Sequence, residues 1–118
     1  MQAKYRLKSN ASFNYIYKRG QSFKNKHLIL IYLNTNSVKI GFSINKKAGK
    51  SVVRNLQKRQ MREIVRAMIP DLKKGHYIFI LRPELVPLTF VQKKATTAHI
   101  LKLAGCFRQS GLVNIESI

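Results

Sequence analysis

The spacing of apolar residues along the chain predicts three helices. Apolar side chains recur at helical spacing over residues 10–19, and a longer amphipathic pattern covers 51–68 and stops before Pro70. Thr89 is a candidate N-cap for a last helix that runs to about residue 107. These segments are long enough for ordinary helices of a globular protein.

Three further segments have the pattern of β-strands. Residues 28–33 and 77–81 are apolar throughout and rich in branched side chains, which is typical of buried strands. Residues 38–44 alternate between apolar and polar, which indicates a strand with one buried face. Because turn-forming residues occupy 34–37, we expect 28–33 and 38–44 to pair as an antiparallel hairpin.

This order of elements predicts an α+β fold, a two-layer sandwich of helices on a small sheet. A chain of 118 residues with 45% hydrophobic residues fits a single domain, 1–118, with one small core. Residues 108–118 show no clear pattern, so the sequence assigns no structure to this tail.

The charge balance is unusual for a globular chain. Lys and Arg total 23 and Asp and Glu total 4, which gives a formal net charge of +19 and a pI near 10.7. Self-repulsion of this size works against a compact chain unless a polyanion offsets it. Nucleic acid is therefore the leading partner class, and an anionic membrane surface is the second.

Several classes of protein conflict with the composition. Cys106 is the only cysteine, which excludes an intrachain disulfide and a zinc site built from several thiolates. No apolar stretch follows the N-terminus as a secretory signal, and the longest apolar runs are too short to span a bilayer. We expect a cytoplasmic protein.

The helix over 51–68 carries cations four residues apart. Like charges at this spacing repel by about 0.2–0.5 kcal/mol per pair, and Glu63 is the only acid in the helix. Such a ridge indicates contact with RNA or DNA phosphates, and a merely solvated face is the alternative. The basic ridge consists of Lys50, Arg54, Lys58, Arg62 and Arg66, with Arg59 beside it. The buried stripe is expected at Val52, Val53, Leu56, Ile64, Ala67 and Met68.

Two smaller features add to this hypothesis. Lys46, Lys47 and Lys50 lead into the basic helix, where backbone N–H groups attract phosphate. Phe13 and Tyr17 lie one turn apart on the first helix and either stack on unpaired bases or pack in the core.

Residues for catalysis by the protein are scattered. The acids and histidines form no local pair for acid–base chemistry, for Mg²⁺ or for a transition metal. The chain is therefore expected to perform no chemistry alone and to bind no metal or other cofactor. The scattered acids and histidines are Glu63, Asp71, Glu84, Glu116, His27, His76 and His99.

Residues 41–63 resemble the signature of the bacterial ribonuclease P protein subunit. Residues 41–47 fit the strand pattern G-hydrophobic-S-x-x-K-K, and 52–62 fit the helix pattern V-x-R-N-x-x-K-R-x-x-R. The similarity extends over about residues 4–107 and includes Arg6-Leu7-Lys8, Phe13, Gly20 and Gly75-x-Tyr77.

The resemblance implies a fold and a function. It implies a left-handed βαβ crossover, an extra short strand near residues 21–23 and the order α-β-β-β-α-β-α. In this family an RNA subunit with Mg²⁺ is the catalyst of 5′ leader removal from precursor tRNA, an endonuclease reaction of tRNA processing. The protein is a monomer within that ribonucleoprotein and binds the RNA subunit and the single-stranded leader.

The resemblance also implies site residues. RNA binding falls on the basic helix, at Arg54, Asn55, Lys58, Arg59 and Arg62. The leader cleft falls on Phe13, Tyr17 and Ser43. Two positions depart from the family pattern: Leu56 stands where a second Arg is common, and Tyr32 is one place late, so strand periodicity puts it outside the cleft.

Two other classes of function remain open. A small basic ribosomal protein, or another protein that binds structured RNA, would explain the charge but not the motif at 41–63. A DNA-binding regulator is disfavoured because no helix-turn-helix pair precedes the basic helix.

Overall fold

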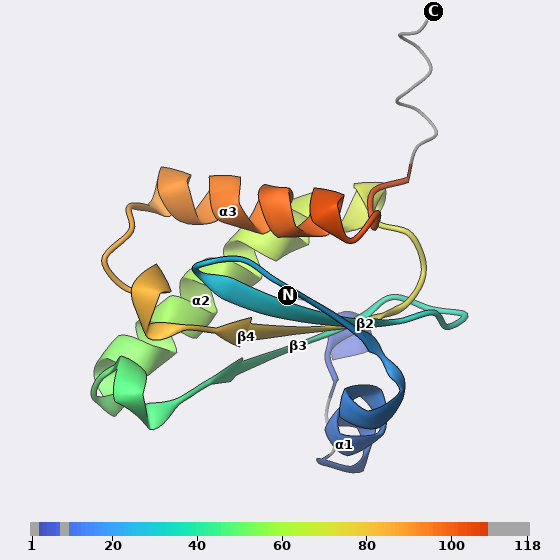
Figure 1. The fold of residues 1–118 in the computed structure, drawn as a ribbon, viewed down its shortest axis with the longest axis horizontal. Helices are drawn as coiled ribbons and strands as arrows, with labels where there is room; N and C mark the ends of the chain where they lie inside the picture. Colours follow the sequence, from blue (N-terminus) through green and yellow to red (C-terminus); the bar gives the residue numbers. More distant parts are fainter. Residues whose placement is uncertain (1–2, 8–9, 109–118) are drawn as a thin grey trace, which may run out of the picture.

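A computed structural model describes residues 3–7 and 10–108, and most of the tail at 108–118 lies outside this part of the chain (Figure 1). The order of elements is the expected α-β-β-β-α-β-α, with short 3₁₀ turns between them. The helices and strands are α1 (Asn10–Arg19), β1 (Gln21–Lys24), β2 (Leu28–Leu33), β3 (Lys39–Ile44), α2 (Ser51–Met68), β4 (His76–Leu81) and α3 (Phe90–Leu103).

The strands form one four-stranded sheet in the order β1-β2-β4-β3. β1 and β2 pair antiparallel, β2 and β4 pair antiparallel, and β3 and β4 pair parallel with α2 as the connection between them. The sheet is therefore mostly antiparallel, and the α+β class is confirmed. The extra strand that the resemblance implied near 21–23 is β1.

The predicted hairpin between 28–33 and 38–44 is wrong, because β4 lies between β2 and β3. The turn after β2 does reverse the chain, since β2 is antiparallel to β4 and β4 is parallel to β3. Ser37 O accepts from Gly75 N at 3.2 Å, so the turn is bonded to the residue before β4. β4 is apolar on both faces and occupies a central place, where both of its edges are paired.

Helices cover both faces of the sheet, to different extents. α2 and α3 lie together on one face, over a core that includes Tyr77, Phe79, Met61 and Ile100 (Figure 1). α1 packs on the other face over a smaller cluster of Ile16, Ile31 and Ile78. Because α1 is short, part of that second face stays uncovered by a helix.

The ends of α3 follow from local chemistry. Thr89 caps the helix as predicted: its hydroxyl accepts from Gln92 N, and the Gln92 side chain accepts from Thr89 N. The helix ends at Leu103, earlier than the expected residue 107, and Gly105 follows with φ of +68°. A left-handed glycine just after a helix is a common way to end it.

The buried stripe of α2 is only partly the predicted one. Val52 is 78% exposed, Leu56 is 40% exposed and Ala67 is also exposed. The buried stripe begins at Gln57, five residues after Val52, so the first turns of α2 extend past the core. The buried residues are Gln57, Met61, Ile64 and Val65.

Candidate nucleic-acid interface

A small cavity of about 160 Å³ opens at the edge of β3 that faces away from β4. It joins four segments: the residues before α1, α1 itself, β3 and α2. Three cations and two aromatic residues line it, which is a suitable combination for a nucleotide with its phosphate. The lining residues are Arg6, Leu7, Phe13, Ile40, Gly41, Phe42, Lys58 and Arg62.

Phe13 both packs on the small core cluster and lines this cavity, so the two alternatives for it are not exclusive. Its ring lies over Gly41, where an added Cβ would be 2.5 Å from Phe13 Cζ. Gly41 therefore permits the close approach that places the ring. Tyr17 is 40% exposed, and its ring centroid lies 6.5 Å from that of Phe13. The two rings form one aromatic surface beside the cations.

Ser43 lies on the same face of β3 as Gly41, two residues along, but does not line the cavity. Its partner across the parallel pairing is Ile80, which is half-buried, as Ser43 is. Ser43 therefore belongs to the part of the sheet face that continues from the cavity beyond α1.

The basic ridge of α2 begins outside the cavity and passes through it. Lys58 and Arg62 are half-buried in the cavity wall, whereas Lys50 is exposed. Arg54 is held against the start of the helix, because its Nε donates to Gly49 O at 3.1 Å. From residue 50 to residue 66 the ridge extends about 24 Å at the helical rise of about 1.5 Å per residue.

Arg66 differs from the rest of the ridge. Its Nη2 donates to both carboxylate oxygens of Glu63, at 2.8 and 3.0 Å. This hydrogen bond and the arginine charge lower the pKa of the Glu63 carboxyl. Both side chains are more than half exposed, so the pair adds little stability, but it neutralises part of the cation's field.

The segment that leads into α2, residues 45–50, carries cations close to the backbone N–H donors of the helix N-terminus. Asn45 Oδ1 accepts from Lys47 N at 2.8 Å and fixes a 3₁₀ turn over Lys46–Ala48. Lys50 is the N-cap residue, with no side-chain cap and no acid in the first turn of the helix. The helix N-terminus thus keeps its attraction for an anion, and Lys46, Lys47 and Lys50 are all exposed around it.

The remaining positions fall in two places. Asn55 and Arg59 are exposed on α2, beside the ridge, and Leu56 is exposed with them. Tyr32 does not line the cavity: it is buried in the α2 and α3 side of the core, and its hydroxyl donates to Lys74 O.

Arg6 is a cavity residue that sequence reasoning missed. It forms a parallel bridge to Ile40, and Leu7 N donates to Ile40 O at 3.0 Å. The N-terminal segment is thereby attached to the edge of β3 and carries its cation into the cavity. The match of Arg6-Leu7-Lys8 to the family pattern was the signal that could have marked it.

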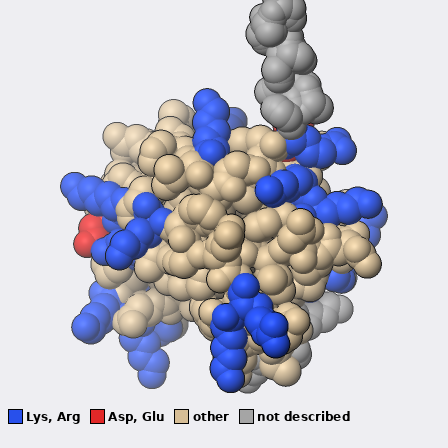
Figure 2. Space-filling model, turned by 45° about the vertical axis from the view of Figure 1, so that its right-hand side comes forward, with Lys and Arg blue, Asp and Glu red and all other residues tan. Residues whose placement is uncertain are grey.

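Cations are also frequent on the surface outside the cavity. Lys and Arg side chains are spread over the face shown in Figure 2, and acidic side chains are nearly absent from it. In the described part of the chain, no three His, Cys, Asp or Glu residues gather as a group that could hold a metal ion. No helix within 3–7 and 10–108 combines the length and apolarity needed to cross a membrane.

Known proteins match both the sequence and the fold. A ribonuclease P protein component of Clostridium kluyveri is 38% identical over 109 residues, 88% of this chain and 97% of the relative. One of a Geobacillus species is 33% identical over 92% of this chain and 97% of the relative. The structure of the Staphylococcus aureus RNase P protein superposes with a TM-score of 0.83 at 33% identity, covering 88% of this chain and 98% of that one.

A more distant structure agrees with these. The RNase P protein of Thermotoga maritima superposes with a TM-score of 0.76 at 27% identity, over 83% of this chain and 96% of that one. The ribonuclease P family model matches residues 1–105, which include every residue of the candidate interface. The chain therefore belongs to the ribonuclease P protein family, whose members are protein components of a ribonucleoprotein that processes tRNA.

Proposed function

We propose that this chain binds the RNA subunit of ribonuclease P through α2 and holds the 5′ leader of precursor tRNA in the cleft at β3. The observation that carries the proposal is the cavity where the Phe13 ring meets Lys58 and Arg62. A single-stranded leader offers unpaired bases and phosphates at short intervals. A ring beside two cations can contact a base and a phosphate at the same time.

The leader would lie along a continuous path. Phe13 and Tyr17 provide rings on which successive bases stack, which contributes about 1–3 kcal/mol per base. Ser43 lies further along the same sheet face and presents a hydroxyl for a phosphate or a base edge. Because none of these contacts requires a particular base, the cleft would accept leaders of varied sequence.

The RNA subunit would occupy the more exposed side of the basic helix. The exposed cations there are Lys46, Lys47, Lys50, Arg59 and Arg66, and Asn55 adds an amide. Phosphate contacts of this kind set position and affinity without reading sequence. Arg54, Lys58 and Arg62 lie between this surface and the cleft, so they would neutralise two RNA backbones that are held close together.

Catalysis is assigned to the RNA subunit and its Mg²⁺, in a cytoplasmic complex that contains one copy of this protein. The chain lowers the repulsion between substrate and RNA subunit, so the complex forms with less Mg²⁺. In this proposal the protein contributes no proton transfer and no metal ligand. A general structured-RNA-binding role would use the same ridge but gives no reason for the aromatic cleft.

A paired titration of precursor tRNA and mature tRNA tests the leader contact. Phe13→Ala is expected to weaken precursor binding to the complex by about 1–3 kcal/mol and to leave mature tRNA nearly unaffected. Tyr15→Ala is the matched control, because Tyr15 is an exposed aromatic on the same helix that does not line the cavity. Equal losses of affinity for the two tRNAs, together with a lowered melting temperature, would show that Phe13 acts only as a core residue.

A further inference from the structure

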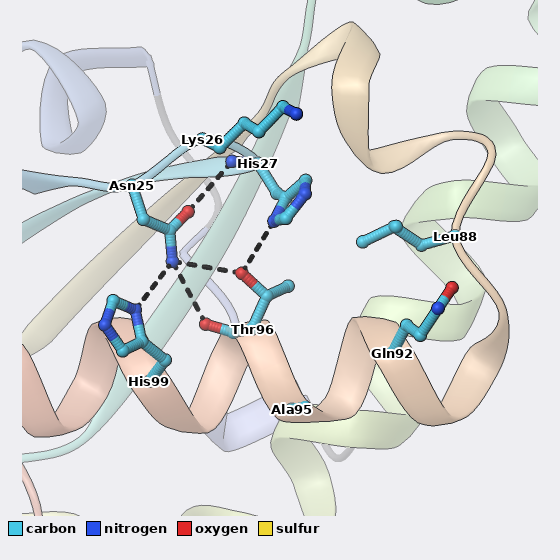
Figure 3. Close-up of a pocket in the computed structure, with 8 residues that line it drawn as sticks. All are labelled: Asn25, Lys26, His27, Leu88, Gln92, Ala95, Thr96 and His99. Carbon is cyan, nitrogen blue, oxygen red and sulfur yellow. Dashed lines mark hydrogen bonds between the residues drawn. The ribbon is translucent and has the colours of Figure 1, made fainter.

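A second hollow lies at the opposite edge of the sheet, between α3 and the turn that joins β1 to β2 (Figure 3). Its volume is about 550 Å³, which is within the range of small-ligand pockets, about 300–1,000 Å³. It shares no residue with the cavity at β3. The lining residues are Asn25, Lys26, His27, Leu88, Gln92, Ala95, Thr96 and His99.

Asn25 organises the polar side of this hollow. Its Nδ2 donates to Thr96 Oγ1 at 3.0 Å and to Thr96 O at 3.3 Å, and it lies within hydrogen-bond distance of His99 Nδ1. Its Oδ1 accepts from His27 N and Leu28 N, both at 2.9 Å. One amide therefore ties the β1–β2 turn to the middle of α3.

The two histidine rings are held by the same network. His99 Nδ1 lies 3.2 Å from Asn25 Nδ2, on one side of the network. His27 Nδ1 lies 3.0 Å from Thr96 Oγ1, on the other side of the network (Figure 3). Both rings are anchored through Nδ1, and within the described residues neither Nε2 has a hydrogen-bond partner.

The rest of the lining selects the ligand chemistry. Leu88, Ala95 and the ring faces make much of the wall apolar, and Gln92 adds an amide group. Lys26 is exposed and is the charged member of the lining, and no acidic residue belongs to it. A flat group with polar edges and an attached anion fits this combination, which is the chemistry of a nucleotide.

We infer that this hollow binds an unpaired nucleotide of single-stranded RNA, with the base against His27, His99 and the apolar wall and the phosphate toward Lys26. Histidine rings are common stacking partners of splayed bases. The net charge of +19 favours a polyanion over a neutral or basic peptide as the occupant. The site is separate from the leader cleft and does not depend on the function proposed for it.

Histidine ring signals in two-dimensional NMR spectra of the whole chain test this inference. The probes are adenosine 5′-monophosphate, adenosine and a single-stranded adenosine pentanucleotide. The ring signals of His27 and His99 are expected to shift saturably with the monophosphate and the pentanucleotide. Those of His76, which does not line the hollow, are expected to stay in place and serve as the internal reference. Adenosine is expected to bind several-fold more weakly, since it lacks the phosphate.

Two substitutions on α3 separate filling of the hollow from general damage. Ala95→Phe places a ring in the hollow and is expected to weaken the histidine response at least tenfold. Val91→Phe adds the same ring at a position that is 73% exposed and outside the lining, and is expected to preserve the response. Phe13→Ala is also expected to preserve it, which separates this site from the leader cleft.

The contrary results are equally specific. Unmoved His27 and His99 signals at saturating pentanucleotide would overturn the inference, even if signals around Phe13 shift and the leader cleft is thereby supported. Histidine shifts that survive Ala95→Phe would also overturn it, since the ligand would then lie elsewhere. Equal affinity for adenosine and its monophosphate would contradict the phosphate contact at Lys26.

Discussion

At the scale of single residues, the position of one aromatic ring depends on one missing side chain. Gly41 leaves room for Phe13, and a Cβ at this position would also lie 3.1 Å from Leu7 Cδ1. The ring therefore packs against backbone on one side and lines the cavity on the other. Helical spacing placed Phe13 beside Tyr17, but spacing alone could not show that the ring would do both.

Gly41→Ala tests this dependence. The added methyl group is expected to displace the Phe13 ring, lower the melting temperature and weaken leader-dependent binding. In a Phe13→Ala background the clash partner is gone, so the added cost of Gly41→Ala is expected to be much smaller. Thermal melts of the wild type, both single variants and the double variant measure this coupling. Additive losses would mean that Gly41 acts independently of Phe13.

A buried lysine in the α2–α3 interface is a second residue-scale feature. Lys93 is 3% exposed, and its Nζ donates to Gln60 Oε1 at 2.6 Å, a neutral partner. Burial lowers the pKa of its ammonium group. The folded chain holds this proton less tightly than the unfolded chain, so the charged lysine lowers the free energy of unfolding. Its contribution improves as pH rises toward the ordinary lysine pKa of about 10.4.

We therefore expect Lys93→Met to raise the melting temperature at neutral pH, with the gain over the wild type shrinking as pH rises toward about 10. Lys94→Met, at the exposed neighbouring position, is the control and is expected to change little. Melting curves over a pH series provide the measurement. A variant less stable than the wild type at every pH would show that the bond to Gln60 outweighs the cost of burial.

At the scale of elements, α2 has cations that are not equivalent. Arg54 is placed by a backbone hydrogen bond and has no acidic partner among the described residues, whereas Arg66 is paired with Glu63. The ridge therefore has a stronger field toward its N-terminal end, where the helix N-terminus adds to it.

This asymmetry predicts different salt dependences of RNA-subunit binding. Arg54→Ala is expected to lower the slope of log affinity against log salt by about 0.7–0.9, the value for one phosphate contact. Arg66→Ala is expected to lower it less, and Glu63→Gln to raise it by releasing Arg66. The slopes come from filter binding over a salt series. Unchanged slopes for all three variants would mean that the ridge is only solvated.

The sequence predicted the elements better than their arrangement. The bounds of α1 and α2 follow from periodicity and from Pro70, which are local signals. The neighbour of β2 is β4, whose paired residues lie 43 to 53 positions further along the chain, and turn chemistry contains no information about it. The stripe of α2 was misplaced for a similar reason, since Val52 has the right spacing but lies beyond the core.

The same limit applies to the candidate site. The cations of α2 and the ring of Phe13 were identified from the sequence, because charge and spacing are visible there. The sequence did not predict that these residues meet Arg6 at one cavity. That meeting depends on the pairing of the N-terminal segment with β3. The hollow at Asn25 and His99 gave no sequence signal, because its two sides are 74 residues apart.

At the scale of the whole molecule, the charge of +19 has a clear use in a ribonucleoprotein. The net positive charge stays spread over a surface with few acids, and an RNA partner supplies the anions that offset it (Figure 2). Two RNA strands brought together repel strongly, and either Mg²⁺ or a basic protein can reduce that repulsion. We propose that this chain reduces the repulsion while the RNA subunit cuts.

The most direct test is cleavage of precursor tRNA by a bacterial ribonuclease P RNA subunit at low Mg²⁺, with and without this chain. We expect strong stimulation by the protein at low Mg²⁺, a smaller effect at high Mg²⁺, and no cleavage by the protein alone. Absence of stimulation at low Mg²⁺, or cleavage by the chain without the RNA subunit, would contradict this proposal.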